Sequence, residues 1–119
     1  MHDVTAHTRR RGECPYEAYV GGVFASGRKA DAAKIRAYVD RLREHGSHRL
    51  VAMRAAEKMN DVWQLLPGRH RIFYFWDDSS ARYVLLNGFL KQSRKTPPAE
   101  IEHAEALRAE YLTTAGGKR

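Results

Sequence analysis

Apolar residues recur along the chain at two different spacings, first that of helices and then that of strands. Between Arg28 and His45 they recur every three or four residues, and Gly46 follows at a typical helix end. This pattern predicts a helix over 28–45. A shorter helix is predicted to begin at Pro15, which suits a first helical turn, and to end at Gly27.

The middle of the chain carries three short runs of β-branched, aromatic and aliphatic residues, typical of strands. They cover 62–66, 69–76 and 82–89. The turn residues Pro67-Gly68 and 77–80 separate them, so we expect consecutive antiparallel strands. Asn87-Gly88 is interpreted as a bend or bulge near the end of the last strand, and a hairpin turn is the alternative.

The two ends of the chain complete the predicted single domain, 1–119. Residues 1–13 are expected to form an edge strand or a flexible arm, and the tail 113–119 is expected to fray. A final helix is predicted over 97–111, capped by Thr96, and its inward side is marked by Ile101, Ala104, Leu107 and Leu112. The sequence therefore predicts an α+β fold, with helices on one face of an antiparallel sheet and the other face open.

The net charge of the protein limits the kinds of molecule that it is expected to bind. The formal net charge of +7 and the pI of about 9.9 suit a protein that meets nucleic acid, an anionic membrane or an acidic partner. No apolar run approaches the roughly 20 residues that span a bilayer, and the N-terminus has no signal core, so we expect a soluble cytoplasmic protein that does not use a membrane. The single cysteine, Cys14, is interpreted as a small, partly buried thiol.

Common signatures of nucleotide and zinc enzymes are missing from the sequence. It has no glycine-rich phosphate loop, no Cys-x-x-Cys pair and no His-Glu-x-x-His motif. The six histidines are dispersed along the chain. We therefore expect neither a metal site nor a cofactor.

Cations gather at the strand ends. Arg69 and Arg71 begin the central strand, while others follow the last strand, namely Lys91, Arg94 and Lys95. Alternation along the central strand puts Arg69, Arg71, Phe73 and Phe75 on one face and His70 on the other. If the arginine face is open, its guanidinium groups and aromatic rings suit phosphates and unstacked bases. The alternative is that these are ordinary surface cations.

Several sequence segments resemble the HigB-like, phage-derived branch of the RelE/ParE toxin superfamily, and together they span about 12–112. The segments are Cys14-Pro15-Tyr16-Glu17, Arg41-Leu42-Arg43-Glu44-His45-Gly46, Val62-Trp63-Gln64-Leu65, Arg71-Ile72-Phe73-Tyr74-Phe75, Leu85-Leu86-Asn87-Gly88-Phe89-Leu90-Lys91 and Lys95-Thr96-Pro97. The resemblance implies a RelE-like α+β fold, with two N-terminal helices packed on an antiparallel sheet and a C-terminal helix.

Three positions depart from the family pattern. Gln64 stands where the family usually has glutamate, Leu66 where it usually has arginine, and Asn87 where a histidine is common. Each change removes a charge or a titratable group, so roles that the family gives to those residues do not transfer to this chain. Arg71 and Lys91 match the pattern, and the resemblance implies that both contact phosphate.

The resemblance further implies the toxin of a type II toxin–antitoxin pair, a metal-independent endoribonuclease that cleaves mRNA on the ribosome. Arg71 and Lys91 would be its catalytic residues, and the flanking RNA would be bound by Arg69, His70, Arg94 and Lys95. Its partners would be the cognate antitoxin and mRNA. The alternatives are a ParE-like toxin that binds DNA gyrase without cleaving RNA, and a decayed toxin or phage protein that binds nucleic acid without catalysis.

Overall fold

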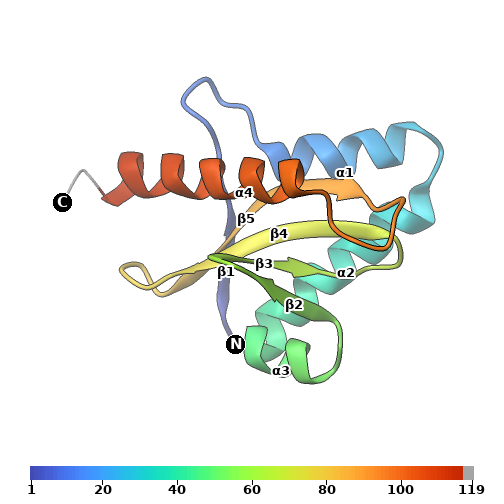
Figure 1. Ribbon diagram of the computed structural model, residues 1–119, viewed down its shortest axis with the longest axis horizontal. Coiled ribbons are helices and arrows are strands. Elements are labelled where there is room, and N and C mark those ends of the chain that lie inside the picture. The colour runs from blue at the N-terminus through green and yellow to red at the C-terminus, as the bar shows by residue number, and fades with distance from the viewer. Residues whose placement is uncertain (117–119) are drawn as a thin grey trace.

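The computed structural model describes residues 1–116 and contains helices on both faces of a five-stranded sheet (Figure 1). In chain order the elements are β1 (Asp3–Ala6), α1 (Pro15–Ala25), α2 (Lys29–His45), α3 (Ser47–Ala52), β2 (Ala56–Met59), β3 (Val62–Leu65), β4 (His70–Asp77), β5 (Arg82–Leu90), α4 (Pro98–Tyr111) and a π-helical turn (Leu112–Gly116). No helix of this described part is long and apolar enough to cross a membrane.

The sheet has the strand order β1-β5-β4-β3-β2. Neighbouring strands from β2 to β5 are antiparallel, which confirms the predicted pairing of β3, β4 and β5. β1 pairs in parallel with β5, so the sheet is mixed and residues 3–6 form the edge strand that was one of the two interpretations of the N-terminal segment. The register between β4 and β5 shifts between Ile72 and Tyr74, which confirms the predicted bulge near Asn87-Gly88.

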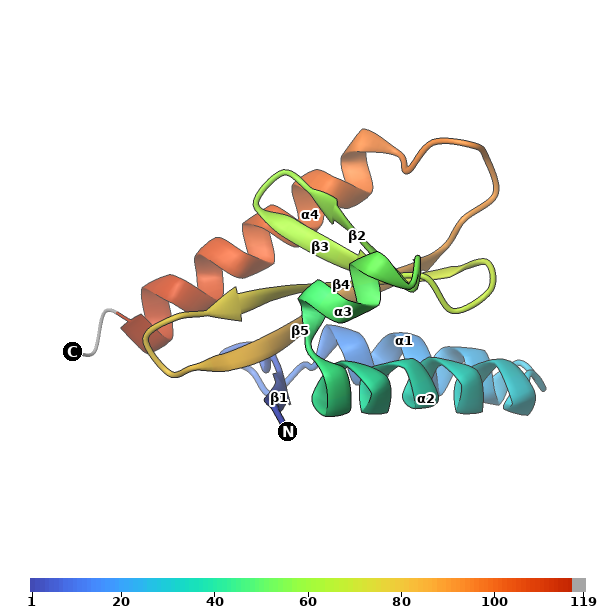
Figure 2. The ribbon, with the colours of Figure 1, turned by 90° about the horizontal axis from the view of Figure 1, so that it is seen from below.

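Two apolar cores lie on opposite faces of the sheet. On one face α1, α2 and α3 enclose a core that includes Val20, Ile35, Leu42, Leu50 and Tyr74. On the other face α4 packs against Val62, Phe73, Phe75, Val84 and Leu86. Figure 2 shows the resulting layers, with α1 and α2 on one side of the sheet and α4 on the other.

The prediction that one face of the sheet is open is wrong for most of its length. Ala104 and Leu107 of α4 are buried, with Ile101 and Leu112 packed beside them, so the predicted inward side of this helix is confirmed. That apolar side needs an apolar partner, and the aromatic rings of β4 supply it. Phe73 and Phe75 are therefore core residues and do not frame the arginines at the surface.

Two elements and one cap differ from the sequence prediction. α3 and β2 were not predicted, because six and four residues of mixed polarity give no clear periodicity. The predicted cap of the last helix is wrong, since Pro97 takes the N-cap position and makes no side-chain cap bond. The Thr96 hydroxyl instead hydrogen-bonds the side chain of Gln64 on β3.

The N-terminal segment is joined to the C-terminal end of α4 by side-chain bonds. His7 is buried, and its Nε2 lies 2.7 Å from Oε1 of Glu110. Arg9 donates to both carboxylate oxygens of Glu110 at 3.1 and 2.9 Å. The hydrogen bond from Arg9, followed by that from His7, lowers the pKa of the Glu110 carboxyl. Of the predicted frayed tail, residues 117–119 lie outside the described residues.

Candidate nucleic-acid interface

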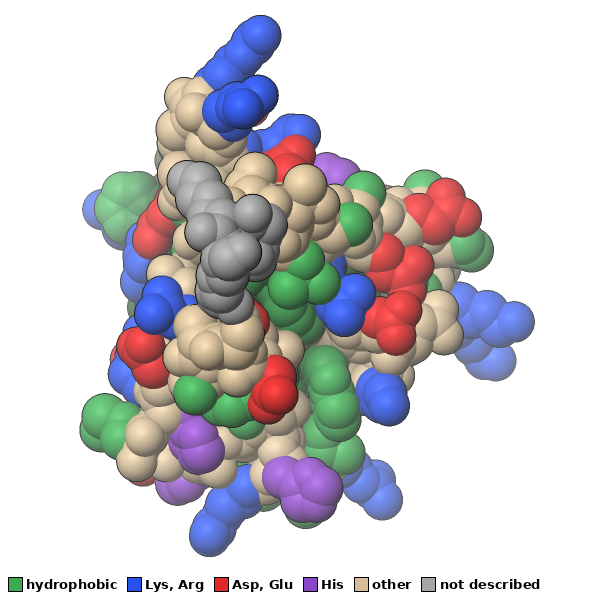
Figure 3. All heavy atoms as spheres, turned by 90° about the vertical axis from the view of Figure 1, so that its left-hand side faces the viewer, with side chains coloured by type: hydrophobic (Ala, Val, Ile, Leu, Met, Phe, Trp, Pro, Cys, Tyr) green, Lys and Arg blue, Asp and Glu red, His purple; other side chains and the backbone are tan. Residues whose placement is uncertain are grey.

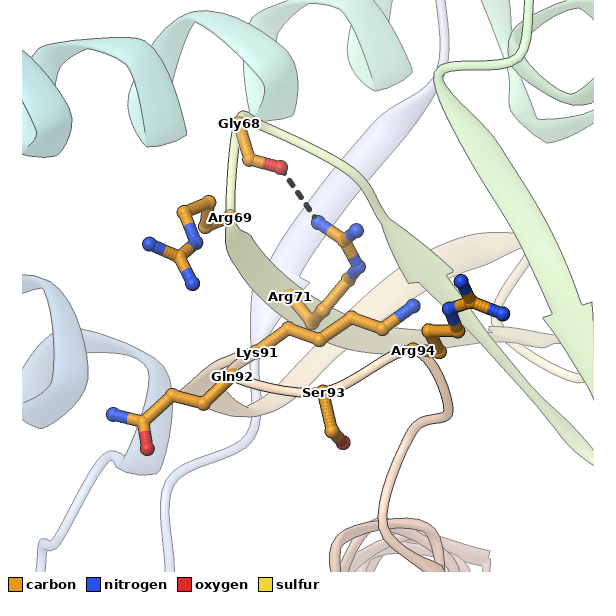
Figure 4. A pocket seen from close by; sticks show the side chains of 7 residues that line it. All are labelled: Gly68, Arg69, Arg71, Lys91, Gln92, Ser93 and Arg94. Carbon is orange, nitrogen blue, oxygen red and sulfur yellow. Dashed lines mark hydrogen bonds between the residues drawn. The ribbon is translucent and has the colours of Figure 1, made fainter.

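A basic pocket of about 480 Å³ lies where the turn before β4 meets the segment after β5 (Figure 4). We call it the basic pocket, and it is lined by Gly68, Arg69, Arg71, Lys91, Gln92, Ser93 and Arg94. Among the residues that the structure describes, no acidic side chain lines it. The face seen in Figure 3, by contrast, mixes acidic, basic, histidine and hydrophobic side chains.

Backbone hydrogen bonds bring the two cationic segments together. The turn before β4 closes with His70 N–H donating to the Pro67 carbonyl at 3.0 Å, and Gly68 in this turn takes a positive φ of 61°. Lys91 N–H then donates to the carbonyl of Arg69 at 2.8 Å. Residues about twenty positions apart in sequence thus share one end of the sheet.

Arg71 is held in place by backbone acceptors. Its Nη1 donates to the carbonyls of Gly68 and His70, each at 2.8 Å. Its Nε is buried and has no hydrogen-bond partner among the described residues, and no carboxylate there forms an ion pair with it. Burial lowers the pKa of the Arg71 guanidinium, which still stays protonated at neutral pH. A charge without a carboxylate partner, facing an open pocket, is suited to an anionic ligand.

The other cations lie around Arg71. In Figure 4 the Lys91 side chain runs alongside that of Arg71, and Arg94 extends toward the same side, whereas Arg69 and Gln92 point away from it. Arg69 and Arg94 are exposed and Lys91 is half-buried. The pocket therefore presents three side-chain cations toward one region of solvent, where a phosphodiester group could be bound by several donors at once.

Two of the residues predicted for RNA binding lie elsewhere. His70 points to the opposite face of the sheet, is buried, and uses both ring nitrogens: the Tyr19 hydroxyl lies 2.6 Å from Nδ1, and Nε2 lies 2.9 Å from Asp31 Oδ2. Its bond to Asp31 lowers the pKa of that carboxyl. Lys95 is exposed and is not among the residues that line the basic pocket.

The sequence did not point to a polar cluster that adjoins the basic pocket. Gln64 is fully buried on β3, and its Nε2 donates to Oε1 of Glu57 at 2.5 Å and to the Thr96 hydroxyl at 3.2 Å. The charge of Glu57 acts on Arg71 and opposes the lowering of its pKa. Gln64, a polar residue in the middle of an apolar strand, could have indicated this cluster from the sequence, because a buried amide needs hydrogen-bond partners.

No group of three or more histidine, cysteine, aspartate or glutamate side chains in the described residues is arranged to hold a metal ion. The chemistry that the basic pocket offers by itself is the binding of phosphate groups and the stabilisation of negative charge.

Comparison with known proteins adds a family to this geometry. The family described as "Phage derived protein Gp49-like (DUF891)" matches residues 24–109, which include α2, the strands β2 to β5 and most of α4. The match thus contains every residue that lines the basic pocket. No curated protein matches the chain. The chain belongs to the phage-derived Gp49-like family, which is of a general RelE-like, toxin-like kind.

Proposed function

We propose that this protein is the toxin of a type II toxin–antitoxin pair and that it cleaves mRNA at the basic pocket, in the cytoplasm and on the ribosome. The observation that carries the proposal is the convergence of Arg71, Lys91 and Arg94 on one pocket without a lining carboxylate, in a chain of the Gp49-like family. Cations fixed around a phosphodiester can stabilise the charge that develops when the linkage is attacked.

The proposed reaction is attack of a ribose 2′-oxygen on the adjacent phosphorus, with departure of the 5′-oxygen. Arg71 is assigned to the charge that grows on the non-bridging phosphate oxygens, because its guanidinium is held by two backbone carbonyls before substrate arrives. Lys91 is assigned to the phosphate or the leaving oxygen, and Arg94 to the flanking backbone. Because the protein supplies the positive charge, the proposed reaction needs no metal ion bound at the basic pocket.

Holding the linkage in line is the second requirement of this reaction. The basic pocket is open to solvent, and Arg69 points away from Arg71 (Figure 4). A surface of this kind makes few contacts with a free flexible RNA. A messenger already ordered in the ribosomal decoding site would be positioned before it meets the toxin, which is why we propose ribosome-bound mRNA as the substrate.

The decisive experiment is induced expression in bacteria, followed by mapping of transcript 5′ ends with translation active and with translation blocked before induction. We expect new ends within coding regions in the first condition, loss of those ends in the second, and none for an Arg71→Ala variant of equal abundance. Growth arrest without new ends, accompanied by inhibited supercoiling by DNA gyrase, would replace the nuclease with a ParE-like mechanism. If expression causes no growth arrest and produces no new transcript ends, the result favours a protein that binds nucleic acid without catalysis.

The same proposal includes an antitoxin that covers the basic pocket. A segment with carboxylate side chains would be attracted to these cations and would exclude RNA from them. Co-purification of the chain with the product of its neighbouring gene tests this. We expect a complex at micromolar concentration that dissociates as salt is raised, and absence of any complex contradicts this part of the proposal.

A further inference from the structure

Glu57 is an acidic residue whose charge acts on Arg71 of the basic pocket. It lies on β2 in register with Gln64 of β3, which in turn pairs with Phe73 of β4. Arg71 precedes Phe73 by two positions, so its side chain leaves the same face of the sheet. Glu57 and Arg71 thus lie on the same face of the sheet, two strands and two positions apart, and Arg71 lines the basic pocket.

The carboxylate of Glu57 is held by a buried scaffold. The Gln64 amide is fully buried and donates one hydrogen to Glu57 Oε1 and the other to the Thr96 hydroxyl. Thr96 is itself buried and ends the segment that carries Lys91 and Arg94. The bond uses only one oxygen of Glu57, and the residue is exposed to solvent on the strand edge, so the carboxylate is both oriented and accessible.

A carboxylate at this place is unfavourable for simple phosphate binding, because it repels the ligand that the cations attract. Its electrostatic effect reaches Arg71, whose pKa it raises against the effect of burial. A site that only bound RNA would bind it more tightly without this charge. A fixed carboxylate whose charge acts on a phosphate-binding arginine is suited instead to removing a proton from a hydroxyl group of the bound RNA.

We propose that Glu57 is the general base of the RNA cleavage proposed above, and that Gln64 is its positioning residue; the inference rests on that proposed function. The Glu57 carboxylate takes the proton of the 2′-hydroxyl as the 2′-oxygen forms its bond to phosphorus. The bond between phosphorus and the 5′-oxygen breaks, and the 5′-oxygen leaves with the electron pair and takes a proton from water. The products are a 2′,3′-cyclic phosphate and a 5′-hydroxyl, and Glu57 returns its proton to solvent.

The test is single-turnover cleavage of mRNA on programmed ribosomes by purified wild type and Glu57→Gln, with RNA affinity measured in parallel. Glutamine keeps an oxygen that can accept the bond from Gln64, so the fold should be preserved. We expect cleavage to slow by roughly a hundredfold to ten-thousandfold, the range typical of a lost general base, while affinity for RNA stays the same or increases. Glu44→Gln, exposed on α2 in the other layer, removes an equal charge and should cleave like wild type.

A substrate with sulfur in place of the bridging 5′-oxygen distinguishes a general-base role of Glu57 from a general-acid role. Thiolate leaves without needing a proton, so this substrate should restore a variant that lacks a general acid and should leave Glu57→Gln slow. A positioning role for Gln64 predicts that Gln64→Ala is slow on both substrates and that RNA affinity is retained.

Glu57→Gln cleaving within threefold of wild type, weaker RNA binding that accounts for its slow rate, or recovery on the sulfur substrate would each overturn the assignment of Glu57. In those cases Arg71→Ala still reports on the proposed nuclease function. No cleavage by wild type, on or off the ribosome, would remove the proposed function itself.

Discussion

Replacement of Arg71 by alanine tests the assignment of the basic pocket most directly, and the structure gives the expected size of its effects. The substitution removes two hydrogen bonds from a charged donor to the carbonyls of Gly68 and His70. Such bonds contribute about 1.5–3 kcal/mol each when they are buried. Arg71 is partly exposed and water can replace it at both acceptors, so we expect a loss of only about 1 kcal/mol in the free energy of unfolding.

That loss is too small to unfold the domain. A change of about 1 kcal/mol lowers the Tm of a domain of this size by roughly 3–5 °C, while total stabilities are about 5–15 kcal/mol. Catalysis should suffer far more, because removing one preorganised donor to a developing charge typically costs about a hundredfold or more in rate. The prediction is therefore a folded protein that no longer arrests growth and no longer cleaves transcripts.

Arg71→Lys should restore little activity. One ammonium group cannot hold both backbone carbonyls and also present two donors to a phosphate, as a guanidinium does. Arg49→Ala, an exposed arginine of α3 outside the basic pocket, is the matched control and should remain toxic. Growth arrest, transcript cleavage and thermal unfolding should be measured on the same preparations. A stable Arg71→Ala protein with full toxicity would refute the reasoning.

Two further predictions concern stability. Burial raises the pKa of the Asp77 carboxyl, but hydrogen bonds from Ser80, Tyr111 and Ser79 outweigh burial and leave the pKa at about 2, against 3.8 in the unfolded chain. About 2 kcal/mol of stability is therefore present above pH 4 and is lost as the pH falls toward 2. The free energies of unfolding of wild type and Asp77→Asn, measured by chemical denaturation, should therefore converge in acid. Gly88→Ala would put a Cβ 2.6 Å from the Tyr19 ring and should lower the free energy of unfolding by roughly 1–3 kcal/mol. Gly21→Ala, at an exposed position of α1 with no contact within 4 Å, should raise it by up to about 1 kcal/mol, and equal Tm values would contradict both predictions.

The sequence was sufficient for the elements whose periodicity is long or whose flanks carry turn residues. α2 has seventeen residues with a regular apolar side, and Gly46 ends it at a φ of 82°. The bulge at Asn87-Gly88 could be predicted because apolar residues on both sides argued against a turn. These features are local, so neighbouring residues specify them without reference to the rest of the fold.

The position of α4 could not be read from the sequence in the same way. Its apolar side is visible in the sequence, but two sheet faces could receive it, and β4 is apolar on both. The choice is made by the volume that α1, α2 and α3 already occupy on one face, which is a property of the whole chain. The predicted cluster of cations did not depend on this choice, because hairpin pairing of β4 and β5 alone brings its members to one sheet end. Of the five predicted cations, all but Lys95 line the basic pocket.

The three departures from the family pattern have unequal consequences for the basic pocket. Asn87 lies at the bulge under α4, with its Nδ2 3.4 Å from His103 Nδ1, and it does not line the pocket. Gln64 is buried and hydrogen-bonded to Glu57, so the carboxylate missing at position 64 is present one strand away. Leu66 is different. It follows Leu65, the strand partner of Ile72, and so lies beside Arg71. Leucine in place of the family's usual arginine therefore leaves one cation fewer near the basic pocket. Position 66 is therefore the departure that weakens the positive charge near the basic pocket, while the cations that surround Arg71 are still in place.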